Sequence, residues 1–243
     1  MGFLIKLWLG LRATLFMAGF VLTTLVYVFV FPLLIFSSYR QRYPVLAFWS
    51  TMNLWWLKVT CGVNYRVLGR ENIPVDSTAL IMSNHQSTWE TMALAEEFPP
   101  LTWVLKRELL KVPVFGWGLR MIKPIAIDRR SGRSAVEQIK VQGKKRLDEG
   151  IWMVIFPEGT RVRPGVKVRY KLGGAVLAAY AGYPVIPVAH NAGMSWPRHS
   201  FIKKPGTITM SIGQPIATQG RTPEDILQEV ERWIEAEKAR LVF

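Results

Sequence analysis

Metal ligands and reactive thiols are scarce in this sequence. Its 243 residues include a single cysteine, Cys61, and three histidines. One cysteine excludes an internal disulfide framework, and so few thiols and imidazoles do not form a ligand set typical of structural zinc. We therefore expect no metal site.

Complete nucleotide-binding and serine-hydrolase motifs are also missing. The sequence has no phosphate-binding glycine loop that ends in Lys and Ser or Thr, and residues 116–118 lack the third glycine of a dinucleotide-binding loop. Residues 193–197 approach a nucleophile elbow but lack its closing glycine. The sequence thus indicates neither a P-loop enzyme nor an elbow-type serine hydrolase.

Acidic residues are few, with 17 Asp and Glu against 31 Lys and Arg, so the formal charge is +14. The first 70 residues carry seven bases and no acid, whereas residues 221–243 carry six acids and four bases. Half of the residues are apolar, which is enough for a folded core. Because the basic N-terminus is interleaved with apolar sequence and no RNA-binding signature is present, we expect an anionic membrane surface as partner and no nucleic acid.

A long uncharged stretch occupies the N-terminal region, where 27 residues separate Arg12 from Arg40. As a helix, residues 15–36 would reach about 33 Å at ~1.5 Å per residue, close to the thickness of a bilayer's hydrocarbon core. The run is longer than the apolar part of a signal peptide, so we expect it in the mature protein. A second apolar stretch, residues 45–57, is too short to span and is rich in aromatic residues.

Two membrane arrangements compete for this region, a spanning helix and a helical hairpin that enters one leaflet. Bases flank the long run on both sides, so a crossing helix would fit the positive-inside rule poorly, and we favour the hairpin. A buried core helix of a soluble protein is the third alternative. We accordingly expect a membrane-embedded helical segment over residues 1–60, an α/β domain over residues 61–243, and a membrane-bound protein on the cytoplasmic face of the inner membrane.

The rest of the chain alternates short apolar runs with amphipathic stretches, which is the pattern of an α/β fold. We expect a mixed, largely parallel central sheet flanked by helices. Strands are predicted at residues 79–82, 101–105, 124–127, 151–156, 185–189 and 207–212. Helices are predicted at about residues 88–98, 110–121, 132–148 and 172–182, with a last helix that begins at the capping residue Thr222.

The first candidate for chemistry follows the strand predicted at 79–82, where residues 83–90 read Ser-Asn-His-Gln-Ser-Thr-Trp-Glu. His85 and Glu90 can pair only if the histidine lies in the turn before the helix and the glutamate in its first turn. The carboxylate could then fix the imidazole tautomer and let the other nitrogen accept a proton. In the alternative interpretation, Ser87 and Glu90 form a capping box and Glu90 only satisfies backbone donors.

The second candidate follows the strand predicted at 151–156 and reads Pro-Glu-Gly-Thr-Arg over residues 157–161. Gly159 would let the backbone approach a ligand closely, and Arg161 offers a planar fork for phosphate oxygens. The alternative is an ordinary turn. Lys106 and Arg129 also follow predicted strands. If these strands are parallel neighbours, their carboxyl ends converge and form one positively charged crevice that suits a phosphorylated substrate.

Together these residues resemble the glycerolipid acyltransferase family, most closely the 1-acyl-sn-glycerol-3-phosphate acyltransferases. Four blocks in the family's order carry the resemblance: Asn84-His85 with Glu90; Lys106 to Leu109 and onward through Pro113 and Gly116 to Ile127-Asp128-Arg129; residues 156–161; and residues 185–188. The resemblance covers roughly residues 61–215. The first block has a glutamate where the family usually has an aspartate.

The resemblance implies transfer of a fatty acyl group from a thioester, acyl-coenzyme A or acyl carrier protein, to the 2-hydroxyl of lysophosphatidate, which forms phosphatidate. In this reading the donor is a co-substrate and no cofactor is needed. His85 would be the base and Glu90 would orient it. The substrate phosphate would be held by Arg161, Lys106 and Arg129, on a loop shaped by Glu158 and Gly159.

Two alternatives remain at this point. A relative that acts on another acceptor, such as glycerol 3-phosphate or another lysophospholipid, would carry the same motifs. A non-catalytic basic protein of the membrane surface would also explain the +14 charge.

Overall fold

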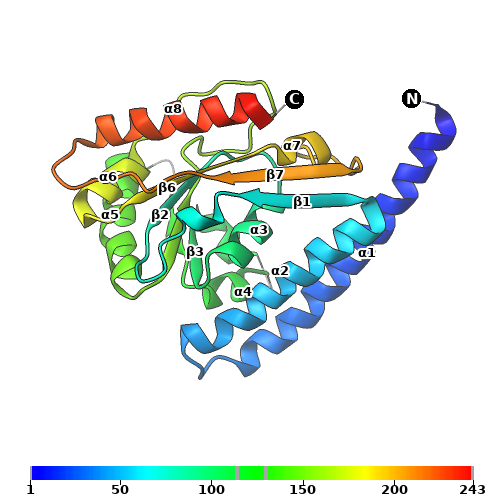
Figure 1. The fold of residues 1–243 in the computed structure, drawn as a ribbon. Coiled ribbons are helices and arrows are strands. Elements are labelled where there is room, and N and C mark those ends of the chain that lie inside the picture. Colours follow the sequence, from blue (N-terminus) through cyan, green and yellow to red (C-terminus); the bar gives the residue numbers. More distant parts are fainter. Residues whose placement is uncertain (1, 113–114, 129–130, 242–243) are drawn as a thin grey trace.

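The computed structural model describes residues 2–112, 115–128 and 131–241, which form one seven-stranded sheet flanked by helices (Figure 1). The strand order is β1-β7-β6-β2-β5-β3-β4. Neighbouring strands are parallel except for the antiparallel pair β6–β7. The strands are β1 (Val63–Leu68), β2 (Leu80–Ser83), β3 (Leu101–Lys106), β4 (Ile125–Ile127), β5 (Trp152–Ile155), β6 (Val185–His190) and β7 (Gly206–Ile212). The expected mixed, largely parallel sheet is confirmed.

Helices cover both faces of the sheet. The helices are α1 (Phe3–Leu33), α2 (Tyr39–Cys61), α3 (Trp89–Glu97), α4 (Phe115–Met121), α5 (Arg133–Asp148), α6 (Gly173–Ala181), α7 (Ala192–Ser195) and α8 (Pro223–Leu241). Two short 3-10 turns, η1 (Arg70–Asn72) and η2 (Arg107–Lys111), complete the set. Helices α5, α6 and α8 contact one another or the middle strands, whereas Figure 1 shows the α1–α2 pair on the opposite side of the sheet from α8.

The middle strands are buried on both faces. Every residue of β2 is buried, and its side chains alternate between two cores: Ile81 packs with α2 and α3, whereas Leu80 and Met82 pack with α6 and α8. This alternation follows from the two-residue repeat of a strand. It explains why β2, β5 and β6 read as continuous apolar runs, the pattern of a parallel strand covered on both sides.

Sequence patterns predicted six of the seven strands in the described chain and missed β1. Val63–Leu68 alternates buried and exposed residues and includes Asn64 and Arg66, so it lacks the apolar run on which the other predictions rested. Its place at the edge of the sheet explains this pattern, since an edge strand needs fewer buried side chains. Its parallel partner is β7, about 140 residues away in the chain, and no local signal predicts that pairing.

The N-terminal region forms a helical hairpin, in which α2 returns alongside α1 (Figure 1). Ser38 and Gln41 form a capping box at the start of α2, and Gly62 ends the helix with a left-handed φ of 67°. Across the hairpin, Thr23 Oγ1 donates to Asn53 Oδ1 at 3.2 Å. Within the described chain, Phe3–Val30 is the one helix long and apolar enough to cross a membrane, with a mean hydropathy of 2.1. This helix indicates association with a membrane.

The hairpin shares a core with the sheet. Phe16 of α1 is fully buried and packs edge-on against Trp196, with ring centroids 5.3 Å apart. The buried Lys203 lies next to this pair, with Nζ 4.8 Å from the centroid of Trp196 and 5.1 Å from that of Phe16. Near the start of α2, the hydroxyl of Tyr43 donates to the backbone oxygen of Ala95 at 2.7 Å. Helix α2 thus lies between α1 on one side and α3 with β1 on the other.

Candidate active site

The loop that follows β2 brings His85 and Glu90 together. His85 lies before α3 and Glu90 lies in its first turn, which is the arrangement that pairing requires. His85 Nδ1 and Glu90 Oε1 are 2.8 Å apart, and the glutamate side chain is fully buried. With Nδ1–H donated to the carboxylate, Nε2 of the neutral ring keeps its lone pair and can accept a proton.

Glu90 also satisfies backbone donors, as the capping interpretation predicted. Its Oε1 accepts from the backbone N–H of Gln86 at 2.9 Å and of Ser87 at 2.7 Å. The same carboxylate therefore both pairs with His85 and satisfies backbone donors before α3. Burial by itself raises the pKa of Glu90, but the hydrogen bonds from His85 and from the backbone N–H of Ser87 oppose it, and this pKa lies below its usual value, so the group is ionised at neutral pH.

A second histidine lies behind Glu90. His190, at the end of β6, is fully buried, and its Nε2 is 4.0 Å from Glu90 Oε2, an oxygen without a hydrogen-bond partner among the described residues. His190 Nε2 donates to the backbone oxygen of Asn84 at 2.9 Å. Burial lowers the pKa of His190, so this ring is neutral. Only the fold places His190 next to the pair.

The ring of His85 lines an apolar cavity of about 380 Å³. It stacks on Phe156, with ring centroids 4.0 Å apart and planes at 11°. The apolar lining residues are Val104, Ile127, Ala135, Val136, Ile139, Ile155 and Phe156. They come from the carboxyl ends of β3, β4 and β5 and from α5, so these neighbouring strand ends converge beside His85, but they form a mainly apolar cavity rather than the positively charged crevice that the sequence predicted.

The loop after β5 is tied to the loop of His85. The side chain of Glu158 is 1% exposed, and its Oε2 accepts from the backbone N–H of His85 at 2.9 Å. In return, the backbone N–H of Val162 donates to the backbone oxygen of His85 at 2.7 Å. Between them Gly159 has a φ of +69°, which favours glycine, and lines the cavity. Glu158 therefore shapes the loop from inside rather than facing the cavity.

The predicted phosphate ligands are more scattered. Arg161 is half-buried, and its Nε is buried without a hydrogen-bond partner in the described parts of the chain. Lys106 is half-exposed, pairs with Glu108 at 3.3 Å, and is not among the described residues that line the cavity. Arg129 lies outside the described residues.

Lys171 was not predicted, although it lines the cavity beside His85 and Gly159. Its Nζ is so close to Gly159 that a Cβ built on the glycine would be 2.7 Å away. A usable signal is present in the sequence, because residues 160–171 contain five bases and no acid. Within the described ranges, no group of three or more His, Cys, Asp and Glu side chains is placed to hold a metal ion.

Fold and site together define an α/β protein with a histidine–carboxylate pair at the carboxyl ends of parallel strands, beside an apolar cavity. A sequence model of the family described as Acyltransferase matches residues 64–191. A 1-acyl-sn-glycerol-3-phosphate acyltransferase from Pseudomonas aeruginosa is 44% identical over 216 residues, which cover 88% of this chain and 83% of that protein. The chain therefore belongs to the acyltransferase family, in its 1-acyl-sn-glycerol-3-phosphate acyltransferase group.

More distant relatives agree. The mouse 1-acyl-sn-glycerol-3-phosphate acyltransferase alpha is 29% identical over 176 residues, which cover 70% of this chain and 60% of that protein. The crystal structure of the lysophosphatidate acyltransferase PlsC from Thermotoga maritima superposes with a TM-score of 0.71 at 24% identity, and the match covers 98% of this chain and 95% of that one. This likeness includes the N-terminal hairpin, so the hairpin is part of the shared fold.

Proposed function

We propose that His85 is the general base with which this protein, a lysophosphatidate acyltransferase, forms phosphatidate. The observation that carries the assignment is the 2.8 Å contact between His85 Nδ1 and the buried Glu90, on a ring that lines the apolar cavity. Glu90 sets the tautomer and stabilises the positive charge that the ring acquires. No acyl-enzyme is required, because the acceptor hydroxyl itself is the nucleophile.

The proposed step is a direct acyl transfer. His85 Nε2 removes the proton of the 2-hydroxyl as its oxygen attacks the thioester carbonyl. The tetrahedral intermediate then collapses, the carbon–sulfur bond breaks, and the leaving thiolate takes the proton from the imidazolium. The products are phosphatidate and the free thiol of coenzyme A or the acyl carrier protein, and His85 returns to its neutral form.

The surroundings of His85 support two binding regions. The apolar cavity suits a fatty acyl chain, because its walls replace water around the chain with aliphatic side chains. Lys171 and Arg161 suit the acceptor's phosphate, since both are cations near the Gly159 loop and the buried Nε of Arg161 still lacks a hydrogen-bond partner within the described residues. Lys106 and Arg129 remain proposed phosphate ligands.

We also propose that the α1–α2 hairpin lies in one leaflet on the cytoplasmic side. Helix α2 is packed against α3 and the edge strand β1, so a spanning α1 would draw this packed domain into the hydrocarbon. Along its outer face α1 exposes large apolar side chains, which favours insertion into the near leaflet. The seven bases and no acids of residues 1–70 suit the positive-inside rule and anionic headgroups.

Acyl transfer by detergent-purified protein tests the assignment. We expect phosphatidate from a labelled acyl thioester and lysophosphatidate with the wild-type protein, and a loss of about 10²-fold or more with His85→Ala, the usual contribution of a general base. Parallel reactions with acyl-coenzyme A and acyl carrier protein identify the donor, and glycerol 3-phosphate tests the acceptor. Undiminished phosphatidate formation by His85→Ala would refute the role of His85. Product only from glycerol 3-phosphate would refute the acceptor.

A further inference from the structure

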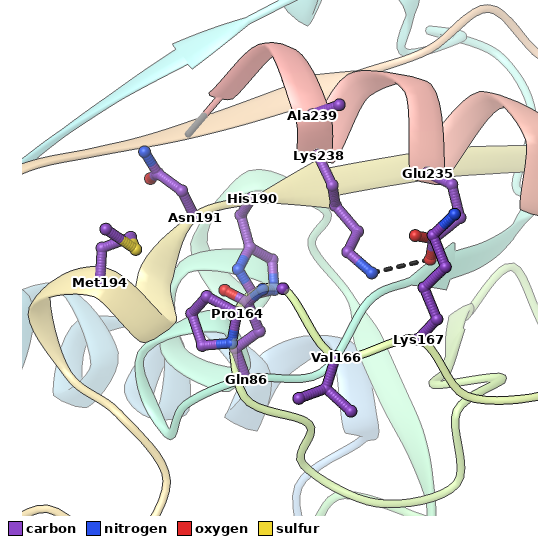
Figure 2. A pocket seen from close by; sticks show the side chains of 11 residues that line it. Gln86, Pro164, Val166, Lys167, His190, Asn191, Met194, Glu235, Lys238 and Ala239 are labelled. Atoms are coloured by element: carbon purple, nitrogen blue, oxygen red, sulfur yellow. Dashed lines mark hydrogen bonds and ion pairs between the residues drawn. The ribbon is translucent and has the colours of Figure 1, made fainter. Parts of the chain in front are cut away.

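The C-terminal helix reaches the back of the active-site loops. Helix α8 lies outside residues 64–191, the part that the family model matches, yet it packs against β6 and α6. Figure 2 shows Lys238 projecting from α8 toward Glu235, across a cavity from His190 and Gln86. This cavity has a volume of about 220 Å³ and is separate from the one that His85 lines. The side chain of Lys238 is 13% exposed.

A short chain of polar contacts runs from Lys238 to the backbone of His85. Lys238 Nζ is 3.6 Å from Glu158 Oε1, and the other oxygen of Glu158 accepts from the backbone N–H of His85 at 2.9 Å. Lys238 Nζ also donates to Glu235 Oε1 at 2.7 Å. The hydroxyl of Tyr170 donates to that same glutamate oxygen at 2.9 Å, which fixes the position of Glu235.

The protonation state of Glu158 matters for the geometry of His85. A carboxylate accepts an N–H hydrogen bond more strongly than a neutral carboxyl group does. Burial raises the pKa of Glu158 to about 7, so the buried group is only partly ionised near neutral pH. The hydrogen bond from His85 and the charge of Lys238 favour the carboxylate, whereas Glu235 on α8 and Glu90 on α3 oppose it. Tyr170, His190 and Lys167 are further titratable groups beside this cluster.

We propose that Lys238 is a positioning residue for acyl transfer, which holds Glu158 as the carboxylate that fixes the backbone of His85. The inference deepens the proposed function and rests on His85 as the base. Under this proposal α8 completes the active site without touching substrate. Lys238 and Glu158 act as one unit, so the effect of changing one depends on the other.

The decisive measurement is the pH profile of kcat for Lys238→Met between pH 6 and 9, expressed relative to the wild type at each pH. An opposite charge within about 4–6 Å typically lowers a carboxyl pKa by one to three units, so its loss raises the pKa of Glu158 from about 7 by roughly one unit. The ionised fraction at pH 7 then drops about fivefold and is nearly restored at pH 9. We expect kcat to follow this fraction, with KM for both substrates unchanged.

Three further variants separate this role from a structural one. Lys238→Arg keeps the charge and should restore the wild-type profile. Arg232→Met removes a positive charge from an exposed site of the same helix and should leave the profile unchanged. In Glu158→Gln the side-chain oxygen that accepts from His85 cannot titrate. Adding Lys238→Met to that variant should therefore lower kcat no further.

The outcomes divide clearly. The proposal would be overturned if Lys238→Met lost the same fraction of kcat at every pH, or if it kept the wild-type kcat throughout. It would also be overturned if Lys238→Arg failed to restore kcat, or if Lys238→Met lowered kcat as much in the Glu158→Gln background as in the wild type. If the wild type and Arg232→Met themselves form no phosphatidate, the proposed function fails instead. The activity of these two proteins therefore tells the two failures apart.

Discussion

One oxygen of Glu90 accepts from the ring of His85 and from two backbone amides, and this arrangement separates the effects of two conservative substitutions. Glu90→Gln can still present an oxygen to the amides, but it loses the charge that stabilises the imidazolium. We expect kcat to fall by about 10²-fold, the lower end of a general base's contribution, with little loss of thermal stability. Phosphatidate formation and a thermal unfolding curve measure the two quantities.

Glu90→Asp keeps the charge and carries the residue that the family usually has. We expect it to retain substantial activity, because His85 lies on a loop that can follow a shorter side chain. Activity of Glu90→Gln equal to that of Glu90→Asp would mean that backbone capping is the whole role of this residue.

Lys171 lines the cavity and Arg161 follows Gly159 by two residues, and each should act on the acceptor rather than on the donor. A hydrogen bond to a charged group contributes roughly 1.5–3 kcal/mol, so Arg161→Ala or Lys171→Ala should raise KM for lysophosphatidate about 10- to 100-fold. KM for the acyl thioester should change little. Arg163→Ala, at an exposed site of the same loop, is the matched control. Equal increases in both KM values would contradict a phosphate-binding role.

At the scale of elements, α1 is attached to the catalytic domain through Phe16. This side chain is fully buried against Trp196, so Phe16→Ala leaves a cavity between α1 and the rest of the fold. We expect a loss of about 3–5 kcal/mol of unfolding free energy in detergent, the usual cost of such a truncation. Leu15→Ala, at a neighbouring site that is 51% exposed, should change this free energy little.

Because α1 and α2 share a core with the sheet, deleting them is not a clean test of membrane anchoring. Deletion of residues 1–58 would remove Phe16, Leu54 and Leu57 from the shared core. The remainder would then expose its apolar face, so its behaviour with membranes would not report on the anchor alone. Substitutions on the outer face of α1 test the anchor without disturbing the core.

At the scale of the whole molecule, exposed apolar side chains of α1 form the proposed membrane-binding face. Leu15, Leu22 and Leu25 are about half-exposed or more. Changing all three to Asn should lower the partition into anionic vesicles by more than about 10²-fold, since each leucine gains ~1.5–3 kcal/mol on leaving water. Co-sedimentation with phosphatidylglycerol vesicles measures this partition, and circular dichroism checks the fold.

The control changes apolar residues that are exposed elsewhere, Val75 and Val141, to Asn. These substitutions should leave vesicle binding unchanged. Unaltered binding by the α1 variant would place the anchor on another surface.

The sequence by itself determined the elements and the motifs, because both depend on residues close together in the chain. Apolar runs indicated six of the strands, and the spacing of His85 and Glu90 allowed a pair at a strand end, which the family resemblance favoured over simple capping. The long uncharged run likewise predicted a membrane helix. Local patterns determine such features since a helix turn or a strand is made of neighbouring residues.

Only the tertiary structure decided which distant groups meet. The order of the sheet places His190 behind Glu90 and brings Lys171 to the cavity, and the packing of α8 brings Lys238 to Glu158. Edge strand β1 is likewise recognisable only by its pairing with β7. The physical reason is that these contacts depend on how strands are ordered and how helices cover them, which the total packing of the chain determines rather than any one segment.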